Sequence, residues 1–177
     1  MGARVTLVTA RTSSPAPAGI DTVEGMSVGA MRDAVLKAMP DADALVMAAA
    51  VSDFAPTTAA KTKLQRKAGL TLELAATPDI LSDVRKKYPK KLLVGFALET
   101  EDAAGSLARG REKLKRKGLD LIAVNNPLRR GSEFGSDRND VTLLAKEGAD
   151  APLGLRPKRE IAREILLRVA AALNGKG

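Results

Sequence analysis

The chain has 177 residues, a formal net charge of +8 and a pI of about 9.9. It contains no Cys, His or Trp, which excludes disulfides, thiol nucleophiles, imidazole bases and Cys/His zinc sites within this sequence. Its length favours one domain, and no apolar run approaches the ~20 residues that span a bilayer.

The excess of basic over acidic residues suits an anionic partner, either a nucleic acid or a small phosphorylated ligand. Chemistry that depends on charge neutralisation, as with nucleotides and phosphates, fits the remaining side chains best. With three Phe and one Tyr, the chain has few rings on which single-stranded nucleic acid could stack, so we expect no nucleic-acid partner. A solvated basic surface is the alternative explanation of the charge.

The N-terminal part alternates between strand and helix patterns. A β-branched, alternating strand is predicted over 4–9, with a second short strand near Val23. Ser27 is predicted to cap a helix that ends at Pro40. Residues 45–50 read as a short, buried, central strand, and 51–67 as a polar, Lys-rich loop.

The same alternation continues to the C-terminus. Strands are predicted over 70–76, 91–98, 119–126 and 141–144, and helices over 77–87, 101–117 and 157–173. Thr77 is expected to cap the first of these helices, with Pro78 in its first position and Asp79 at its positive end. Gly105 and Gly110 weaken the prediction of the second helix.

Alternating strands and helices predict an α/β protein with a Rossmann-like three-layer sandwich and a mostly parallel sheet. Ligands in that architecture lie beyond the carboxyl ends of the strands. Polar or small residues follow four of the predicted strands there, at Ser52-Asp53, Thr77-Pro78-Asp79, Glu99-Thr100 and Asn125-Asn126. Ordinary turn chemistry explains each loop alone, but four on one edge favour a site.

Two groups of lysines could meet an anionic ligand at that edge. Lys113 and Lys117 share one helix face, although a solvated helix end is the simpler explanation of their spacing. Lys61 and Lys63 lie in the predicted basic loop, which could close over a ligand or simply be solvated. The sequence has neither a Walker-type P-loop nor a G-x-G-x-x-G turn after a strand.

Six segments occur in the order found in one enzyme family: "AAAVSDF" with a following Lys-x-Lys, "TPDIL", "VGFALET", "KLKRKGLDLIAVN" and "FGSDRNDVTL". The chain therefore resembles phosphopantothenoylcysteine synthetase over about residues 3–173. This is the ligase half of the bifunctional phosphopantothenoylcysteine decarboxylase/synthetase of coenzyme A biosynthesis, in the DNA/pantothenate metabolism flavoprotein family.

The resemblance implies a cytoplasmic ligase that joins 4′-phosphopantothenate to cysteine through an acyl-cytidylate formed from CTP, with Mg²⁺. It also implies a homodimer and a fused or separate flavin-dependent decarboxylase, with no FMN in this chain and no membrane. The alternatives are a nucleotide-binding module without catalysis of its own, another Rossmann-like nucleotide-dependent enzyme, and a nucleic-acid binder.

The family's motifs also imply roles for individual residues. Lys61 or Lys63 would act on the reacting phosphate or carboxylate, since the loop reads Lys-Thr-Lys-Leu where the family has Lys-Ile-Lys-Lys. Lys113 and Lys117 would bind the triphosphate. The other residues implied to contact the nucleotide are Ala48, Ala49, Asp53, Pro78, Asp79, Ile80, Leu81 and Phe96.

The chain departs from the family pattern at its start. The family begins with a Gly-rich strand–turn containing "GGT" and then an Asn-x-x-Ser-Ser-Gly segment, whereas "GARVTLVT" matches its second strand. We expect residues 1–177 to form one synthetase-like, nucleotide-binding domain that is incomplete at its N-terminus relative to the family. On that basis the chain alone is expected to be inactive or poorly active.

Overall fold

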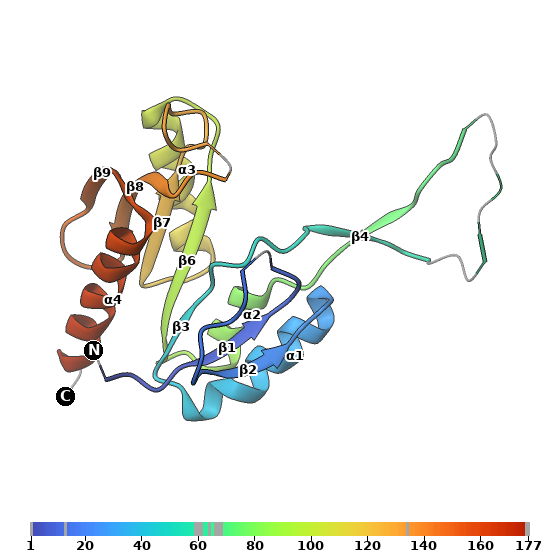
Figure 1. The fold of residues 1–177 in the computed structure, drawn as a ribbon, viewed down its shortest axis with the longest axis horizontal. Coiled ribbons are helices and arrows are strands. Elements are labelled where there is room, and N and C mark those ends of the chain that lie inside the picture. The colour runs from blue at the N-terminus through green and yellow to red at the C-terminus, as the bar shows by residue number, and fades with distance from the viewer. Residues whose placement is uncertain are drawn as a thin grey trace. The chain divides into compact units, whose positions relative to one another are not determined.

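The computed structural model describes residues 2–12, 14–58, 62–63, 65, 69–133 and 135–175. The chain forms two compact units, one built from 1–38 and 49–80 and the other from 39–48 and 81–177. We call them unit 1 and unit 2. Figure 1 labels the elements described below, apart from strand β5 and the 3-10 turn η1.

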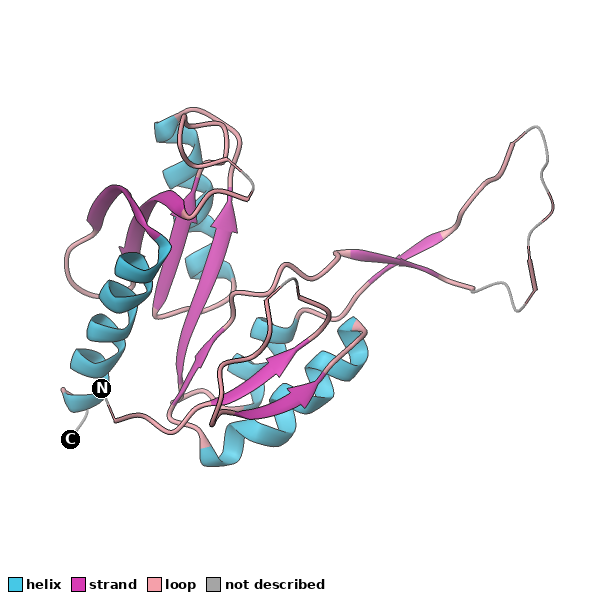
Figure 2. Ribbon diagram, viewed as in Figure 1, coloured by secondary structure: helices cyan, strands magenta, loops and turns pink. Residues whose placement is uncertain are grey.

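The described residues of unit 1 form two separate strand pairs and one helix. The parallel pair is β1 (Thr6–Thr9) and β2 (Asp21–Glu24), and helix α1 (Val28–Ala38) packs against it. The Ser27 hydroxyl accepts a hydrogen bond from the Ala30 N–H at 3.1 Å, which confirms the predicted helix cap. A short antiparallel pair, β4 (Phe54–Pro56) and β5 (Leu74–Ala76), forms an extended arm (Figure 2).

Unit 2 is a five-stranded sheet with the order β3-β6-β7-β8-β9. Strands β3 (Ala44–Val46), β6 (Leu92–Leu98) and β7 (Leu121–Asn125) are parallel to one another. Strands β8 (Arg138–Ala145) and β9 (Ala151–Pro157) continue the sheet in antiparallel fashion. The α/β class is confirmed, and the antiparallel end is an addition that strand–helix alternation does not predict.

Two helices cover opposite faces of this sheet. Helix α4 (Lys158–Asn174) packs on the face that includes Leu92, Leu121 and Leu143. Helix α3 (Ala103–Arg116) approaches Val124 and Leu144, which alternate with those residues along the strands and therefore point the other way. Helix α2 (Ile80–Lys87) and the 3-10 turn η1 (Met39–Asp41) complete the described elements.

The predicted strand over 45–50 is wrong in length and in position. Strand β3 ends at Val46, and it lies at an edge of the five-stranded sheet, so it is not a central strand. Its Ala44 and Leu45 are half-buried, while Ala48 to Ala50 are exposed. The apolar run is therefore a short edge strand followed by small exposed residues that lead to Asp53.

Candidate functional site

Two loops predicted to meet at the site are joined by hydrogen bonds in unit 1. The Thr77 N–H donates to the Asp53 carbonyl at 2.9 Å, and the Thr77 hydroxyl donates to the Ser52 carbonyl at 2.5 Å. The first of these bonds extends the β4–β5 ladder by one step, since Phe54 pairs with Ala76. Asp53 and the Pro78-Asp79 segment are thus held beside each other at the base of the arm.

The same hydrogen bonds correct the predicted role of Thr77. Helix α2 begins at Ile80, so Pro78 is not its first helical residue, and the Thr77 hydroxyl bonds to Ser52 instead of capping it. Asp79 immediately precedes the helix and is exposed. A carboxylate in this place is compatible with the positive end of the helix dipole.

Ile80 and Leu81 anchor the start of helix α2. Their side chains are buried, with 2% and 8% of their surface exposed. A ligand at this helix start would therefore meet their backbone N–H groups, which the first turn of a helix leaves without intrahelical partners.

Phe96 lies on the α4 side of strand β6, because it alternates with Gly95 and shares its side with Val94. Its side chain is 40% exposed, unlike the buried Val94. Gly95 points to the opposite side, where a Cβ atom would lie 2.7 Å from Leu119 Cδ1 and 3.4 Å from Leu81 Cδ1 of helix α2. The Gly-Phe pair therefore allows close packing on one face and presents an open aromatic ring on the other.

Lys113 lies in the last turn of helix α3, and Lys117, four residues later, is the C-cap residue directly after the helix. Both are half-buried, whereas Lys115 between them is exposed. Lys113 Nζ donates to Glu99 Oε1 at 2.5 Å, and the Lys117 N–H donates to the Lys113 carbonyl at 3.0 Å. The cationic side chain of Lys113 is thus held at the end of strand β6.

The predicted residues divide between the two units. Ala49, Asp53, Lys63, Pro78, Asp79 and Ile80 belong to unit 1, and Ala48, Leu81, Phe96, Lys113 and Lys117 belong to unit 2. Lys63 is exposed. Lys61 lies outside the described residues, so its predicted role stays a prediction, as does that of every residue in this set.

Two carboxylates beside helix α3 were given no role in the predicted site, although Glu99 is in one of the four polar loops expected at the strand edge. Glu99 is only 7% exposed and pairs with Lys113. Glu101 pairs with Arg109 at 2.5 Å, and this hydrogen-bonded carboxylate raises the pKa of the Arg109 guanidinium above its ordinary value. Side chains of strand β6 point alternately to the two faces of the sheet. Continuing this alternation one residue past Leu98 places Glu99 on the face that helix α3 covers.

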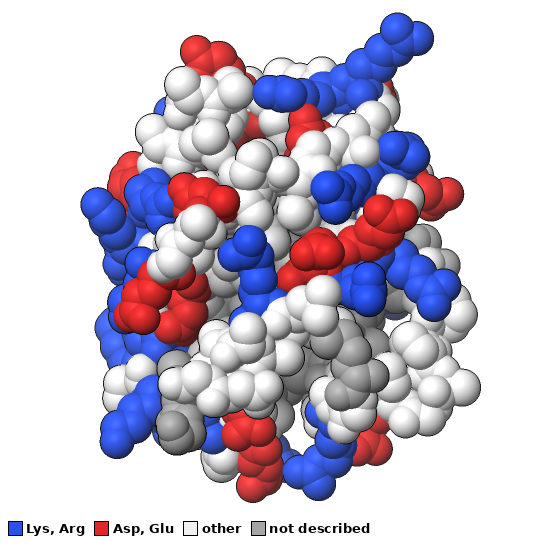
Figure 3. Space-filling view, turned by 90° about the vertical axis from the view of Figure 1, so that its left-hand side faces the viewer, with Lys and Arg blue, Asp and Glu red and all other residues white. Residues whose placement is uncertain are grey.

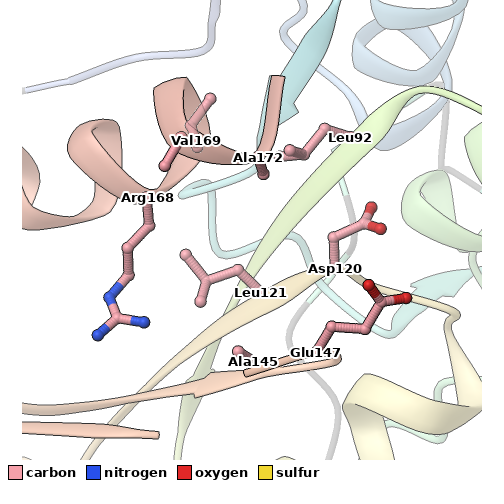
Figure 4. A pocket seen from close by; sticks show the side chains of 9 residues that line it. Leu92, Asp120, Leu121, Ala145, Glu147, Arg168, Val169 and Ala172 are labelled. Carbon is pink, nitrogen blue, oxygen red and sulfur yellow. The ribbon is translucent and has the colours of Figure 1, made fainter. Parts of the chain in front are cut away.

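A cavity of about 200 Å³ lies at the amino ends of strands β6 and β7, away from the carboxyl ends where the site is predicted. Its apolar floor includes Leu92, Leu121 and Val169, with Asp120 and Glu147 to one side and Arg168 to the other (Figure 4). None of the predicted site residues that the structure describes lines it. This cavity is therefore separate from the candidate site.

Charged side chains of both signs are intermixed on the face shown in Figure 3. Within the described part of the chain, no group of three or more acidic side chains could hold a metal ion. No helix among the described residues is both long and apolar enough to cross a membrane.

Comparison with known proteins shows the relationship of the chain. It is 38% identical over 173 residues to the coenzyme A biosynthesis bifunctional protein CoaBC of Bacillus subtilis (strain 168), covering 97% of this chain and 42% of that protein. The CoaBC protein of Mycobacterium tuberculosis (strain ATCC 25618 / H37Rv) is 39% identical over 184 residues, which cover 98% of this chain and 44% of the relative. The chain thus spans less than half the length of these relatives.

The fold agrees with that relationship. The crystal structure of the C-terminal domain of a CoaBC protein superposes with a TM-score of 0.80 at 30% identity, covering 98% of this chain and 76% of the other. The family model described as the DNA/pantothenate metabolism flavoprotein C-terminal domain matches residues 1–173. The chain belongs to the family of DNA/pantothenate metabolism flavoprotein C-terminal domains.

Proposed function

We propose that the chain is the phosphopantothenoylcysteine synthetase part of coenzyme A biosynthesis, a ligase that joins 4′-phosphopantothenate to cysteine. The observation that carries this proposal is the 38% identity to a CoaBC protein over 97% of the chain. The family motifs lie in the matched region, in the family order.

The reaction we propose uses CTP to activate the acid. The carboxylate of 4′-phosphopantothenate attacks the α-phosphorus of CTP, forming an acyl-cytidylate and releasing pyrophosphate. The cysteine amine then attacks the acyl carbon, loses a proton and displaces CMP. Such a reaction needs positioning and charge neutralisation more than a titrating side chain, which suits a chain without His or Cys.

We assign the candidate residues to different parts of that nucleotide on the basis of the family motifs. We assign Asp53, Ala48 and Ala49 to the nucleoside side, where exposed small residues let a ligand approach the backbone. The exposed ring of Phe96 offers an apolar surface to the base. The N–H groups at the start of helix α2 would face anionic oxygens.

In this proposal, lysines bind the phosphates and contact the reacting group. Lys113 and Lys117 present two cations on one helix face, which suits a triphosphate. We assign the reacting phosphate or carboxylate to Lys61 or Lys63. A lysine supplied by a loop can neutralise charge as pyrophosphate leaves.

Mg²⁺ is proposed to enter with the nucleotide. It prefers oxygen ligands and usually binds through substrate phosphates and water with one or two carboxylates. That mode does not require a cage of three acidic side chains, so it is compatible with the described residues. When bound, the ion would shield the phosphate oxygens from the attacking carboxylate.

We also propose a cytoplasmic homodimer that works with a flavin-dependent decarboxylase, fused or separate. The arm of unit 1 supports association with a second copy. Leu70, Leu72 and Leu74 are 66%, 61% and 53% exposed, and their two-residue spacing places them on one side of an extended segment. A row of exposed leucines of this kind is typical of a surface that another chain covers.

The test is an assay of CMP release with Mg²⁺ and CTP. We expect release that depends on both 4′-phosphopantothenate and cysteine. The assay is run with the chain alone and with the Gly-rich segment of a relative supplied. CTP binding without CMP release in either arm would favour a nucleotide-binding module without catalysis.

A further inference from the structure

Glu99 is a buried carboxylate at a fixed point of the sheet. It directly follows strand β6, and its N–H donates to the Asn125 carbonyl at 3.0 Å, where strand β7 ends. Only 8% of its side chain is exposed. A charge in such a place is costly unless it is paired.

Lys113 is the cation that pairs with this carboxylate. The Nζ atom lies 2.5 Å from Glu99 Oε1, and 36% of the lysine side chain is exposed. An ammonium group has three N–H donors, so a contact to Glu99 leaves donors that can meet a ligand. Loss of the contact would leave the buried carboxylate uncompensated, which favours keeping it when a ligand binds.

The bond also restricts the lysine. A free lysine side chain samples many rotamers, and immobilising it on binding reduces affinity. The contact with Glu99 holds the Nζ atom at the carboxyl end of strand β6. A lysine that is ordered in this way would lose less conformational entropy when a ligand binds.

A second ion pair, between Arg109 of helix α3 and Glu101 just before the helix, is less buried. Glu101 and Arg109 lie 2.5 Å apart, yet their side chains are 41% and 59% exposed. The two pairs share charge and distance but differ in how much solvent surrounds them. Glu101 is therefore a matched control for the loss of one negative charge beside helix α3.

We propose that Glu99 is a positioning residue that holds Lys113 for the β- and γ-phosphates of a nucleoside triphosphate. This inference rests on the proposed function, because it takes Lys113 as a phosphate contact. Coulomb repulsion alone makes the opposite prediction. If Glu99 acted only as a nearby negative charge, its removal would tighten the binding of an anionic ligand.

The experiment measures the dissociation constants of CTP and CMP with Mg²⁺ by calorimetry for the wild type, E99A, E99Q, E101Q, K113A and the double variant E99A/K113A. We expect E99A to weaken CTP about tenfold, as for a lost charged contact, and CMP by less than about twofold. E99Q, which keeps a hydrogen-bond acceptor, should lie between E99A and wild type. E101Q should bind CTP within about twofold of wild type, since its pair is exposed.

The double variant tests whether Glu99 acts through Lys113. We expect E99A/K113A to bind CTP no more weakly than K113A, because the two residues form one unit. Losses that add would overturn the inference, as would E99A or E99Q binding CTP as tightly as the wild type or more tightly. Melting temperatures show whether each variant folds. If E99A does not fold, the comparison of CTP affinity between E99Q and the wild type is the test.

Failure of the proposed function gives a different pattern. A wild type that binds no CTP would overturn both proposals. A K113A variant with an unchanged ratio of CTP to CMP affinity would overturn the phosphate contact of Lys113, and with it the role of Glu99. A K113A variant that loses this discrimination while E99A and E99Q keep it would overturn only the role of Glu99.

Discussion

Arg85 and Asp120 join the end of helix α2 to the start of strand β7 through an ion pair of 2.6 Å. Arg85 also donates to the carbonyls of Gly118, Pro89 and Lys91, and Asp120 accepts the Leu93 N–H at 2.8 Å. This one pair therefore ties two loops to the parallel part of the sheet.

Arg85→Ala should lower the free energy of unfolding by about 2–4 kcal/mol, because it leaves a partly buried carboxylate and three carbonyls without this donor. Urea unfolding followed by circular dichroism measures the loss. Lys86→Ala, at an exposed position of the same helix, should change the unfolding free energy by less than about 0.5 kcal/mol. Equal losses in both variants would contradict the proposed role of Arg85.

Gly110→Ala should destabilise the protein although alanine favours helix. A Cβ atom there would lie 2.4 Å from Val124 Cγ2 and 3.1 Å from Leu144 Cδ1, so helix α3 would have to move off the sheet. We expect a net loss of about 1–3 kcal/mol from overpacking. Thermal unfolding provides the measurement.

Gly29→Ala is the control in helix α1, because among the described residues no atom beyond the adjoining residues and the local helix backbone lies within 4 Å of the added Cβ. It should stabilise the protein by up to about 1 kcal/mol through helix propensity. A G110A variant that is as stable as G29A would show that helix α3 does not need the close approach.

Asp150 should contribute stability that disappears in acid. Hydrogen bonds from the Arg111 guanidinium hold the pKa of this carboxyl below its ordinary value of about 3.9, with further help from the Ala145 N–H. Its contribution is then fully present above that ordinary pKa and is lost as the pH falls through the lower, folded-state pKa. Because the pair is 34% and 42% exposed, we expect only about 0.5–1 kcal/mol.

Unfolding free energies of wild type and Asp150→Asn, measured from pH 7 to pH 3, test this expectation. The two curves should be separated near neutral pH and converge below about pH 4. Glu147→Gln, which removes an exposed carboxylate from the same turn, should leave the shape of the curve unchanged. A separation between wild type and D150N that grows in acid would contradict the assignment.

Lys113→Ala and Lys117→Ala should each weaken CTP more than CMP, because only the triphosphate carries the additional anionic groups. The expected loss is about 1–3 kcal/mol per lysine, as for a charged hydrogen bond. Lys115→Ala is the control, since its side chain lies off the shared face and is exposed. Equal weakening of both nucleotides would mean that these lysines do not contact the β- and γ-phosphates.

The sequence predicts the elements whose pattern is regular. Helix α3 and strands β6 and β7 appear where apolar periodicity places them, within a few residues. Strand β9 was missed because Pro152, Gly154 and Pro157 do not read as a strand. Proline is tolerated there since β9 lies at an edge of the sheet.

Contacts that depend on tertiary packing could not be predicted in the same way. The sequence predicts Thr77 as a helix cap, but its hydroxyl donates to the carbonyl of Ser52, which lies 25 residues earlier in the chain. Gly110 looked like a weak point of a helix, and only its distance to Val124 shows why a side chain does not fit. Helical spacing predicts the face on which Lys113 lies. Predicting its contact with Glu99 also requires knowing which side of strand β6 faces helix α3.

The most direct test of nucleotide recognition is a calorimetric titration of the chain with CTP, CMP and NAD in the presence of Mg²⁺. The proposed function predicts saturable binding of CTP, weaker binding of CMP because it lacks two phosphates, and no saturable binding of NAD. Saturable binding of NAD with no binding of millimolar CTP would contradict it and would favour a different Rossmann-like enzyme.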